Sequence, residues 1–181
     1  MTLPSVLSDL DLPAAELYAA RLDGEVFAVG GAFLAVDEIE QPRHRVTAAL
    51  AGLQVTLIAE RLSAAWVWGA LSAPPARHEF CVGIGSRVAH SAARWMTVRE
   101  VVIDGDEIVE LEGGLVTSPL RTVVDLVRFG DRFDAAEAGV VRRLAAIGDV
   151  HLDDAAHSIE ARRNLPGKHR ALARLRQCGL P

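Results

Sequence analysis

The feature that most constrains this chain is the segment VTSPLRTVVDLVR at residues 116–128. It contains a clear helix start, since serine is a preferred N-cap at Ser118, and Pro119 suits the first helical position, where its missing N–H would have no partner. The apolar side chains that follow recur at helical spacing. They are Leu120, Val123, Val124 and Val127. The pattern predicts a helix that begins at Pro119 and buries one face, with Val124 in the core.

The size and composition of the chain limit the kind of fold that can surround this helix. With 181 residues, half of them apolar, it is long enough for one domain, or one domain with a small appendage, and for a core that needs no metal or disulfide. Cys81 and Cys178 are far apart and form no CxxC pair, which favours a reducing, cytoplasmic compartment. The first residues show neither a basic flank nor a long apolar run, so we expect no secretion and no membrane association.

The N-terminal segment has the order of a helix followed by a hairpin. Residues 12–22 form the expected helix, and two short apolar runs, 25–29 and 32–37, flank a Gly30-Gly31 turn. A helix followed by a hairpin is the order of the last helix and the wing in a winged helix. Only about a dozen residues precede the helix, too few for the full three-helix set. Residues 1–40 are therefore predicted to be a degenerate winged-helix-like segment.

The remaining chain, residues 41–181, is predicted to be an α/β domain whose last part, from about residue 134, is helical. Expected helices cover 42–53, 63–71 with Ser63 as N-cap, 134–146, 151–163 and 167–177, and expected strands cover 54–58, 78–84, 95–103 and 107–112. Trp66 and Trp68 cannot share one helical face, so one is expected in the core and the other at a seam or contact surface. The predicted fold class is α+β: a small helix–hairpin unit packed on a mixed α/β domain with C-terminal helices.

Charge is unevenly distributed along the chain. Residues 1–40 hold eight acids and one arginine, a net charge of −7, whereas residues 41–100 and 141–181 each carry +4. Because DNA affinity comes largely from Lys and Arg at phosphates, any DNA contacts are expected in the two basic segments. The candidates are Arg43, Arg45, Arg170 and Arg174. The alternative is that these charges only solvate the surface.

Arg121, Asp125 and Arg128 lie on one side of the helix that begins at Pro119. Arg121 occupies its first turn, where the helix dipole disfavours a cation, and Arg before Asp is the weaker order for such a pair. A residue placed against local preference often serves a tertiary or functional contact. Two interpretations remain open: an ion network that locks the helix onto the sheet, or a site for an anionic group or a partner.

Enzymatic motifs are weak. His151, Asp153 and His157 do not make a recognised metal-ligand set, so no metal is expected. Asp104 and Asp106 superficially resemble the carboxylate pair of a nucleotidyltransferase but straddle a glycine in a predicted turn. No phosphate loop or nucleophile elbow occurs. We predict no catalytic residue and no cofactor, and thus a protein that is not an enzyme; a small nucleotidyl-transfer enzyme is the remote alternative.

Four stretches together resemble the AbiEi-type antitoxin and transcriptional-regulator family of bacteria. They are the helix–hairpin segment 12–37, SAAWVWGAL at 63–71, VTSPLRTVVDLVR at 116–128 and NLPGKHRALARL at 164–175. The resemblance implies an N-terminal winged-helix DNA-binding region and a C-terminal antitoxin domain. It also implies repression of the protein's own operon and neutralisation of a nucleotidyltransferase-like toxin in a type IV toxin–antitoxin system.

The predicted function is therefore that of a bacterial antitoxin-like transcriptional regulator that binds operator DNA, a cognate toxin, or both. The alternative is a protein-interaction module without DNA binding. The charge beside the hairpin discriminates between them, because a positive surface favours DNA and a negative one favours a protein partner. The DNA sequence, the identity of the toxin and the oligomeric state stay open.

Overall fold

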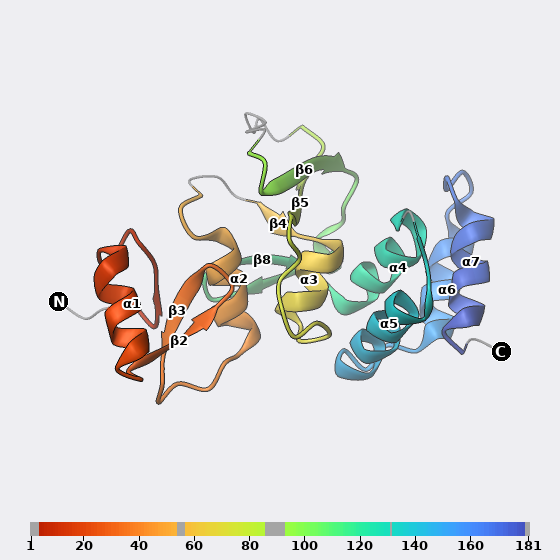
Figure 1. The fold of residues 1–181 in the computed structure, drawn as a ribbon. Helices are drawn as coiled ribbons and strands as arrows, with labels where there is room; N and C mark the ends of the chain where they lie inside the picture. Colours follow the sequence, from red (N-terminus) through yellow and green to blue (C-terminus); the bar gives the residue numbers. More distant parts are fainter. Residues whose placement is uncertain (1–3, 54–56, 86–92, 131, 180–181) are drawn as a thin grey trace.

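The structure is a computed structural model that describes residues 4–53, 57–85, 93–130 and 132–179. A helix with a three-stranded sheet forms one end, a five-stranded sheet with two helices occupies the middle, and four helices form the other end (Figure 1). The two termini lie at these opposite ends. The prediction of an α+β fold is confirmed.

The N-terminal unit consists of β1 (Val6–Leu7), α1 (Ala14–Leu22), β2 (Val26–Val29) and β3 (Ala32–Ala35). The three strands are antiparallel in the order β1-β3-β2. The hairpin predicted around Gly30-Gly31 is confirmed, with Val29 paired to Ala32 and the turn residue Gly30 at a φ of 60°. We name residues 4–40 the helix–hairpin unit.

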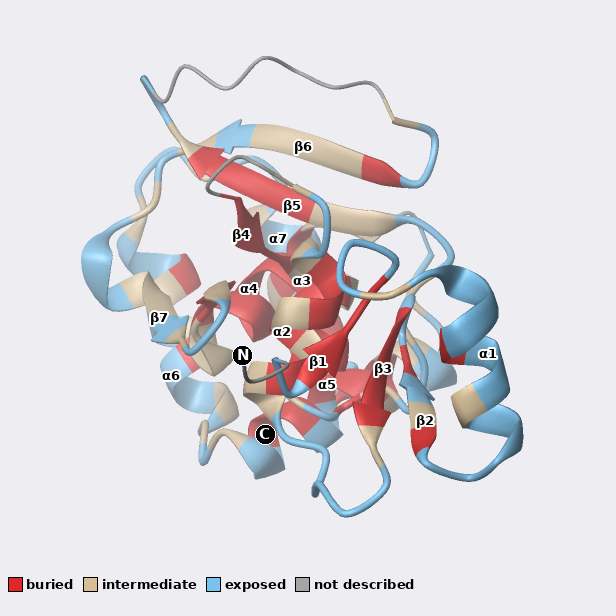
Figure 2. Cartoon of the chain, turned by 90° about the vertical axis from the view of Figure 1, so that its left-hand side faces the viewer, coloured by how far each residue is buried: buried red, intermediate tan, exposed pale blue. Residues whose placement is uncertain are grey.

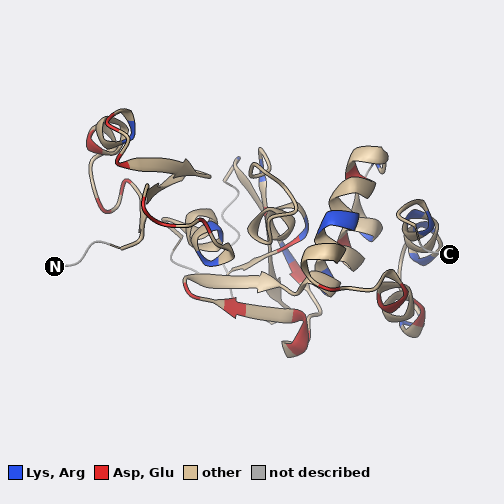
Figure 3. Ribbon diagram, turned by 90° about the horizontal axis from the view of Figure 1, so that it is seen from below, with Lys and Arg blue, Asp and Glu red and all other residues tan. Residues whose placement is uncertain are grey.

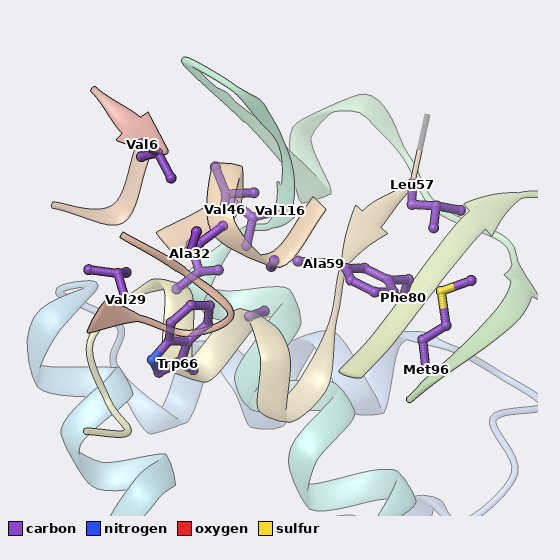
Figure 4. Packing of buried hydrophobic residues seen from close by; sticks show 14 of the residues in the cluster. Val6, Val29, Ala32, Val46, Leu57, Ala59, Trp66, Phe80, Met96 and Val116 are labelled. Atoms are coloured by element: carbon purple, nitrogen blue, oxygen red, sulfur yellow. The ribbon is translucent and has the colours of Figure 1, made fainter. Parts of the chain in front are cut away.

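The helix–hairpin unit shares the central core of the protein. Its hairpin packs on α2 (Pro42–Leu50) and α3 (Arg61–Val67), where Val29 and Ala32 lie close to the indole of Trp66 (Figure 4). A Cβ at Gly30 would lie 3.0 Å from Trp66 Cη2, so the turn fits closely over this ring. A separate small apolar cluster holds α1 against the hairpin. Its buried members are Leu7, Leu17, Val26 and Phe33.

The central sheet contains five strands in the order β6-β5-β4-β8-β7. They are β4 (Ile58–Ala59), β5 (His78–Gly83), β6 (Met96–Val101), β7 (Ile108–Leu111) and β8 (Gly114–Thr117). The pairs β4–β8 and β5–β6 are parallel and the other two are antiparallel, so the sheet is mixed. Its central strand β4 is fully buried (Figure 2), and half of the residues in each of the flanking strands β5 and β8 are buried.

Helix α3 begins earlier than predicted. Ser63 is not its N-cap; that position belongs to Glu60, because β4 leads directly into the helix. Ser63 lies inside α3, and its buried hydroxyl accepts the Glu79 N–H at 2.9 Å. Trp66 is buried and Trp68 lies between the two main apolar clusters, as predicted for the core and the seam.

The C-terminal part is helical, as predicted. Helix α4 (Pro119–Phe129) begins at the expected cap, since the Ser118 hydroxyl accepts the Arg121 N–H at 3.3 Å, and Val124 is buried. Around it pack α5 (Ala135–Ile147), α6 (Leu152–Ala161) and α7 (Lys168–Gln177). Of the predicted strand 54–58, residues 54–56 lie outside the described residues and β4 begins at Ile58. Across the described ranges, no helix combines the length and apolarity needed to cross a bilayer.

Candidate functional site

The surface of the helix–hairpin unit is strongly acidic. Every acidic residue of this unit lies at the surface, although the Glu40 carboxylate is paired with Arg45 on α2, and Arg21 is the unit's single basic residue (Figure 3). The acids are Asp9, Asp11, Glu16, Asp23, Glu25, Asp37, Glu38 and Glu40. The surface beside the hairpin is therefore negative, which is unfavourable for contacts with phosphates.

The same unit exposes large apolar side chains. Tyr18 and Leu22 on α1 are 57% and 89% exposed, and Val36 and Ile39, just after the hairpin, are 63% and 77% exposed. Helix α1 precedes the hairpin in the chain, in the order of the last helix and the wing of a winged helix. Its exposed residues combine Glu16, Arg21 and apolar groups. This combination of acidic and apolar groups matches a protein surface better than a DNA backbone.

The structure separates the roles of Arg43 and Arg45. Arg43 is partly exposed and pairs with the exposed Glu112 at 3.1 Å. Arg45 is held inside the fold, because its guanidinium pairs with Glu40, donates to the Trp66 carbonyl at 2.7 Å and lies over the indole of Trp66. These contacts explain why a cation is tolerated in the first turn of α2. Arg43 stays a candidate for phosphate contact, whereas Arg45 is needed for packing.

Arg170 and Arg174 also differ, although both are on α7. Arg170 is exposed and donates to the Arg128 carbonyl at 2.9 Å. Arg174 is buried, with its guanidinium bound to the carbonyls of Val127 and Gly130 at 3.1 and 2.7 Å. A guanidinium held at the end of α4 in this way cannot reach DNA without leaving the core. Of the four candidate arginines, Arg43 and Arg170 are therefore the two whose side chains lie at the surface.

Arg121, Asp125 and Arg128 come together in a buried ion network. Asp125 accepts from Arg121 Nε at 2.8 Å and faces Arg128 Nη1 at 3.5 Å, and all three side chains are at least nine-tenths buried. Arg121 also pairs with Glu107, whose other carboxylate oxygen pairs with Arg162 at the end of α6. This network connects α4 to the segment before β7 and to α6.

A second buried ion pair lies at the edge of the central sheet. Glu60, which is 1% exposed, accepts two hydrogen bonds of 2.6 Å from Arg99 on β6. The Phe129 ring connects this pair to the network on α4, because the guanidinium carbons of Arg99 and Arg128 lie 4.3 and 4.5 Å from its centroid. Such cation–π contacts stabilise partly desolvated arginines.

The electrostatics of the network follow from burial and pairing. Burial raises the pKa of the Glu60 carboxyl above its usual range although Arg99 opposes this effect. Burial also raises the pKa of Glu107, but the Asp104 N–H and the guanidinium groups of Arg121 and Arg162 outweigh it, so the net pKa lies below the ordinary value. For Arg128, burial is the main cause of a lowered pKa. Buried carboxylates thus hold guanidinium groups from several elements in place.

The sequence did not reveal four members of this network: Glu60, Arg99, Glu107 and Arg162. Glu60 and Arg99 are 39 residues apart in the chain, Glu107 is 14 residues from Arg121, and Arg162 is 55 residues from Glu107. Local sequence spacing therefore does not indicate these pairs. Every carboxylate of this network has a guanidinium partner, which favours the structural interpretation of Arg121, Asp125 and Arg128. The buried Nε–H of Arg128 has no acceptor among the described residues, so a site for an anionic group stays the alternative interpretation.

The residues considered for catalysis do not converge. Asp104 and Asp106 are both exposed at the short 3-10 turn η1 (Gly105–Glu107). Within the described ranges, no group of three His, Cys, Asp or Glu residues could hold a metal ion. The absence of an enzymatic activity stays a prediction.

The comparisons with known proteins inform the fold alone. No protein-family model matches the chain, and neither does any curated protein sequence. Among solved structures, the fold is similar to the crystal structure of the Rv2827c protein from Mycobacterium tuberculosis. The match has a TM-score of 0.53 and 18% sequence identity, and it covers 98% of this chain and 73% of that one. The arrangement of helices and sheets described above is therefore shared with a known structure over almost its whole length.

Proposed function

We propose that this chain is a non-enzymatic, cytoplasmic bacterial regulator of the antitoxin type that binds a cognate nucleotidyltransferase-like toxin through its helix–hairpin unit. One observation carries the proposal: the unit exposes eight acids together with Tyr18, Leu22, Val36 and Ile39. Stable protein interfaces combine a buried apolar centre with a polar rim. The class of partner comes from the resemblance to the AbiEi-type family.

This surface defines the chemistry of its partner. A matching toxin surface carries lysines or arginines around an apolar centre, because like charges across an interface are strongly unfavourable. The apolar side chains supply the affinity and the acids supply the selectivity. Leu22, at 89% exposure, makes little contribution to the fold and is therefore a clean probe of binding.

The test measures the affinity of the purified chain for the protein encoded beside its gene, by isothermal titration calorimetry. Leu22→Ala, and the double change Glu16→Lys with Asp37→Lys, should each weaken binding by at least about tenfold. Glu110→Lys is the matched control, because Glu110 is exposed on β7, outside the helix–hairpin unit. The absence of a complex, or equal losses for the control and the test variants, would contradict the proposal.

Operator DNA is a second candidate, favoured by the basic residues exposed around the start of α7. Those residues are Arg163, His169 and Arg170. Changing both Arg43 and Arg170 to alanine should weaken binding to the DNA upstream of the chain's own gene. The slope of the logarithm of the binding constant against the logarithm of the salt concentration should become less steep by about two. Arg94→Ala changes another exposed arginine and is the control. DNA binding that follows this pattern, without a toxin complex, would replace the first proposal by the second.

A further inference from the structure

A cavity of about 370 Å³ lies among the start of α3, the end of α4 and the first turns of α5. Its volume is in the range of small-molecule sites. A closed apolar cavity of about 150 Å³ holds one benzene ring, so this cavity has room for a molecule of about two fused rings. The residues that line it are Arg61, Leu62, Leu126, Gly130, Arg132, Phe133, Glu137, Val140 and Val141.

The inner wall of the cavity is apolar. Leu126, Val140 and Val141 are buried, and Leu62 and Phe133 are partly buried around them. A molecule that replaces water against these side chains must present hydrocarbon to them. The Phe133 ring also offers an aromatic contact, which favours a ligand that is itself aromatic.

The polar groups of the lining already have partners. The Arg61 guanidinium pairs with Glu79 at 2.9 Å, and its buried Nε does not reach the cavity. The Gly130 carbonyl accepts a hydrogen bond of 2.7 Å from Arg174, and the Glu137 carboxylate accepts a backbone N–H at the start of α5 at 2.8 Å. A polar ligand would therefore lose hydrogen bonds to water and gain few in the cavity.

The charges of the lining are balanced. Because Glu79 neutralises Arg61, the remaining charges are one cation, Arg132, and one anion, Glu137. Among the described residues of the lining, Arg132 alone is exposed, so it lies at the solvent side. An ion that enters an apolar cavity loses its hydration, and here it meets no charge in excess that would offset the loss. The lining thus selects against anions and cations alike.

We propose that this cavity binds a small neutral aromatic molecule of about two fused rings, held between the aliphatic wall of Leu126, Val140 and Val141 and the ring of Phe133. Apolar contact supplies the affinity, and the lack of available hydrogen-bonding groups excludes polar and ionic ligands. This inference does not depend on the proposed toxin or DNA partner.

The first experiment titrates the full chain with naphthalene and follows the methyl resonances of Leu126, Val140 and Val141 by NMR. Naphthalene should bind saturably and shift these signals, while the methyl signals of Leu34 in the central core stay unchanged.

Three further probes test the size and the charge of the ligand. Benzene leaves part of the cavity unfilled, and 2-naphthoate and 2-naphthylmethylammonium each carry a charge, so each should bind about tenfold or more weakly than naphthalene. No saturable shift with naphthalene, shifts at Leu34 in place of the lining residues, or equal affinity for benzene or either ion would overturn the proposal.

The second experiment compares variants. Leu62→Trp places a larger side chain at a half-buried position of the lining, so it should fill the cavity and weaken naphthalene binding at least about tenfold. Phe133→Leu keeps an apolar wall but removes the ring, and should weaken binding about threefold to tenfold. Leu10→Trp makes the first substitution at a residue that is 73% exposed and outside the lining, and is the matched control. Circular dichroism checks that each variant folds. Unchanged naphthalene affinity in folded Leu62→Trp or in Phe133→Leu would refute the assigned site.

Discussion

Asp125 is the residue on which the buried ion network depends most. It is fully buried and faces both Arg121 and Arg128. Removing one member of a buried pair leaves charge without compensation, so Asp125→Ala should lower the free energy of unfolding by about 3–5 kcal/mol. Urea denaturation measures the loss. Glu112→Ala removes an exposed partner of Arg43 and should cost less than about 1 kcal/mol; a similarly small cost for Asp125→Ala would show that the network contributes little.

Glu107 should make stability depend on pH. Its folded-state pKa lies below the ordinary value of 4.5, because the Asp104 N–H, Arg121 and Arg162 outweigh the effect of burial. The ionised carboxylate therefore stabilises the fold above pH 4.5, and this contribution disappears as the pH falls through the lower folded-state pKa. In Glu107→Gln, the midpoint of urea denaturation should fall less steeply than in the wild type as the pH is lowered below 4.5. Glu110→Gln, on the exposed side of β7, should leave the slope unchanged; equal slopes in the wild type and Glu107→Gln would contradict the prediction.

At the scale of single residues, the sequence predicted local features and missed distant ones. The Ser118 cap follows from residue types within a few positions, and the structure confirms it. The Glu60–Arg99 pair joins residues that are 39 positions apart, and the burial of Arg174 depends on carbonyls at the end of α4. Charge counts alone could not separate exposed arginines from buried ones.

Among the elements, the turn between β7 and β8 packs closely on α2. Gly113 has a φ of 101°, and a Cβ there would clash with Thr47 Oγ1 on α2. Gly113→Ala should therefore cost about 1–3 kcal/mol, since it adds both backbone strain and a clash. Gly31→Ala is the matched control, because a Cβ there meets nothing within 4 Å and its φ is not positive. Equal melting temperatures for the two variants would contradict this packing.

Helices and strands were predicted correctly where the sequence pattern was long, and were missed where a strand forms only through pairing with other strands. The hairpin around Gly30-Gly31 and the C-terminal helices follow from turn chemistry and helical periodicity. The strands β1 and β8 were not predicted, because β1 has two residues and β8 has four, too few to show an alternating pattern. Strand β1 is stabilised by pairing with β3, and β8 by pairing with β4 and β7. The predicted N-cap of α3 was wrong by three residues, since Ser63 bonds to β5 and Glu60 occupies the cap position.

Across the whole molecule, we expect unfolding in a single cooperative transition. The hairpin shares its core with α2 and α3, so the boundary predicted at residue 40 does not separate two apolar clusters. Leu34→Ala, at a fully buried hairpin position, should cost about 2–5 kcal/mol and lower the transitions seen by tryptophan fluorescence and by far-UV circular dichroism together. Leu22→Ala should change neither transition. Two transitions that shift separately would show that the helix–hairpin unit unfolds on its own.

The opposite charges of the two ends have a kinetic consequence. Residues 1–40 carry −7 and residues 141–181 carry +4, and the termini lie at opposite ends of the molecule (Figure 1). The chain thus has a permanent electric dipole moment along its length, and its field turns an approaching charged molecule before contact. Salt should therefore slow the association of a basic partner much more than it speeds dissociation.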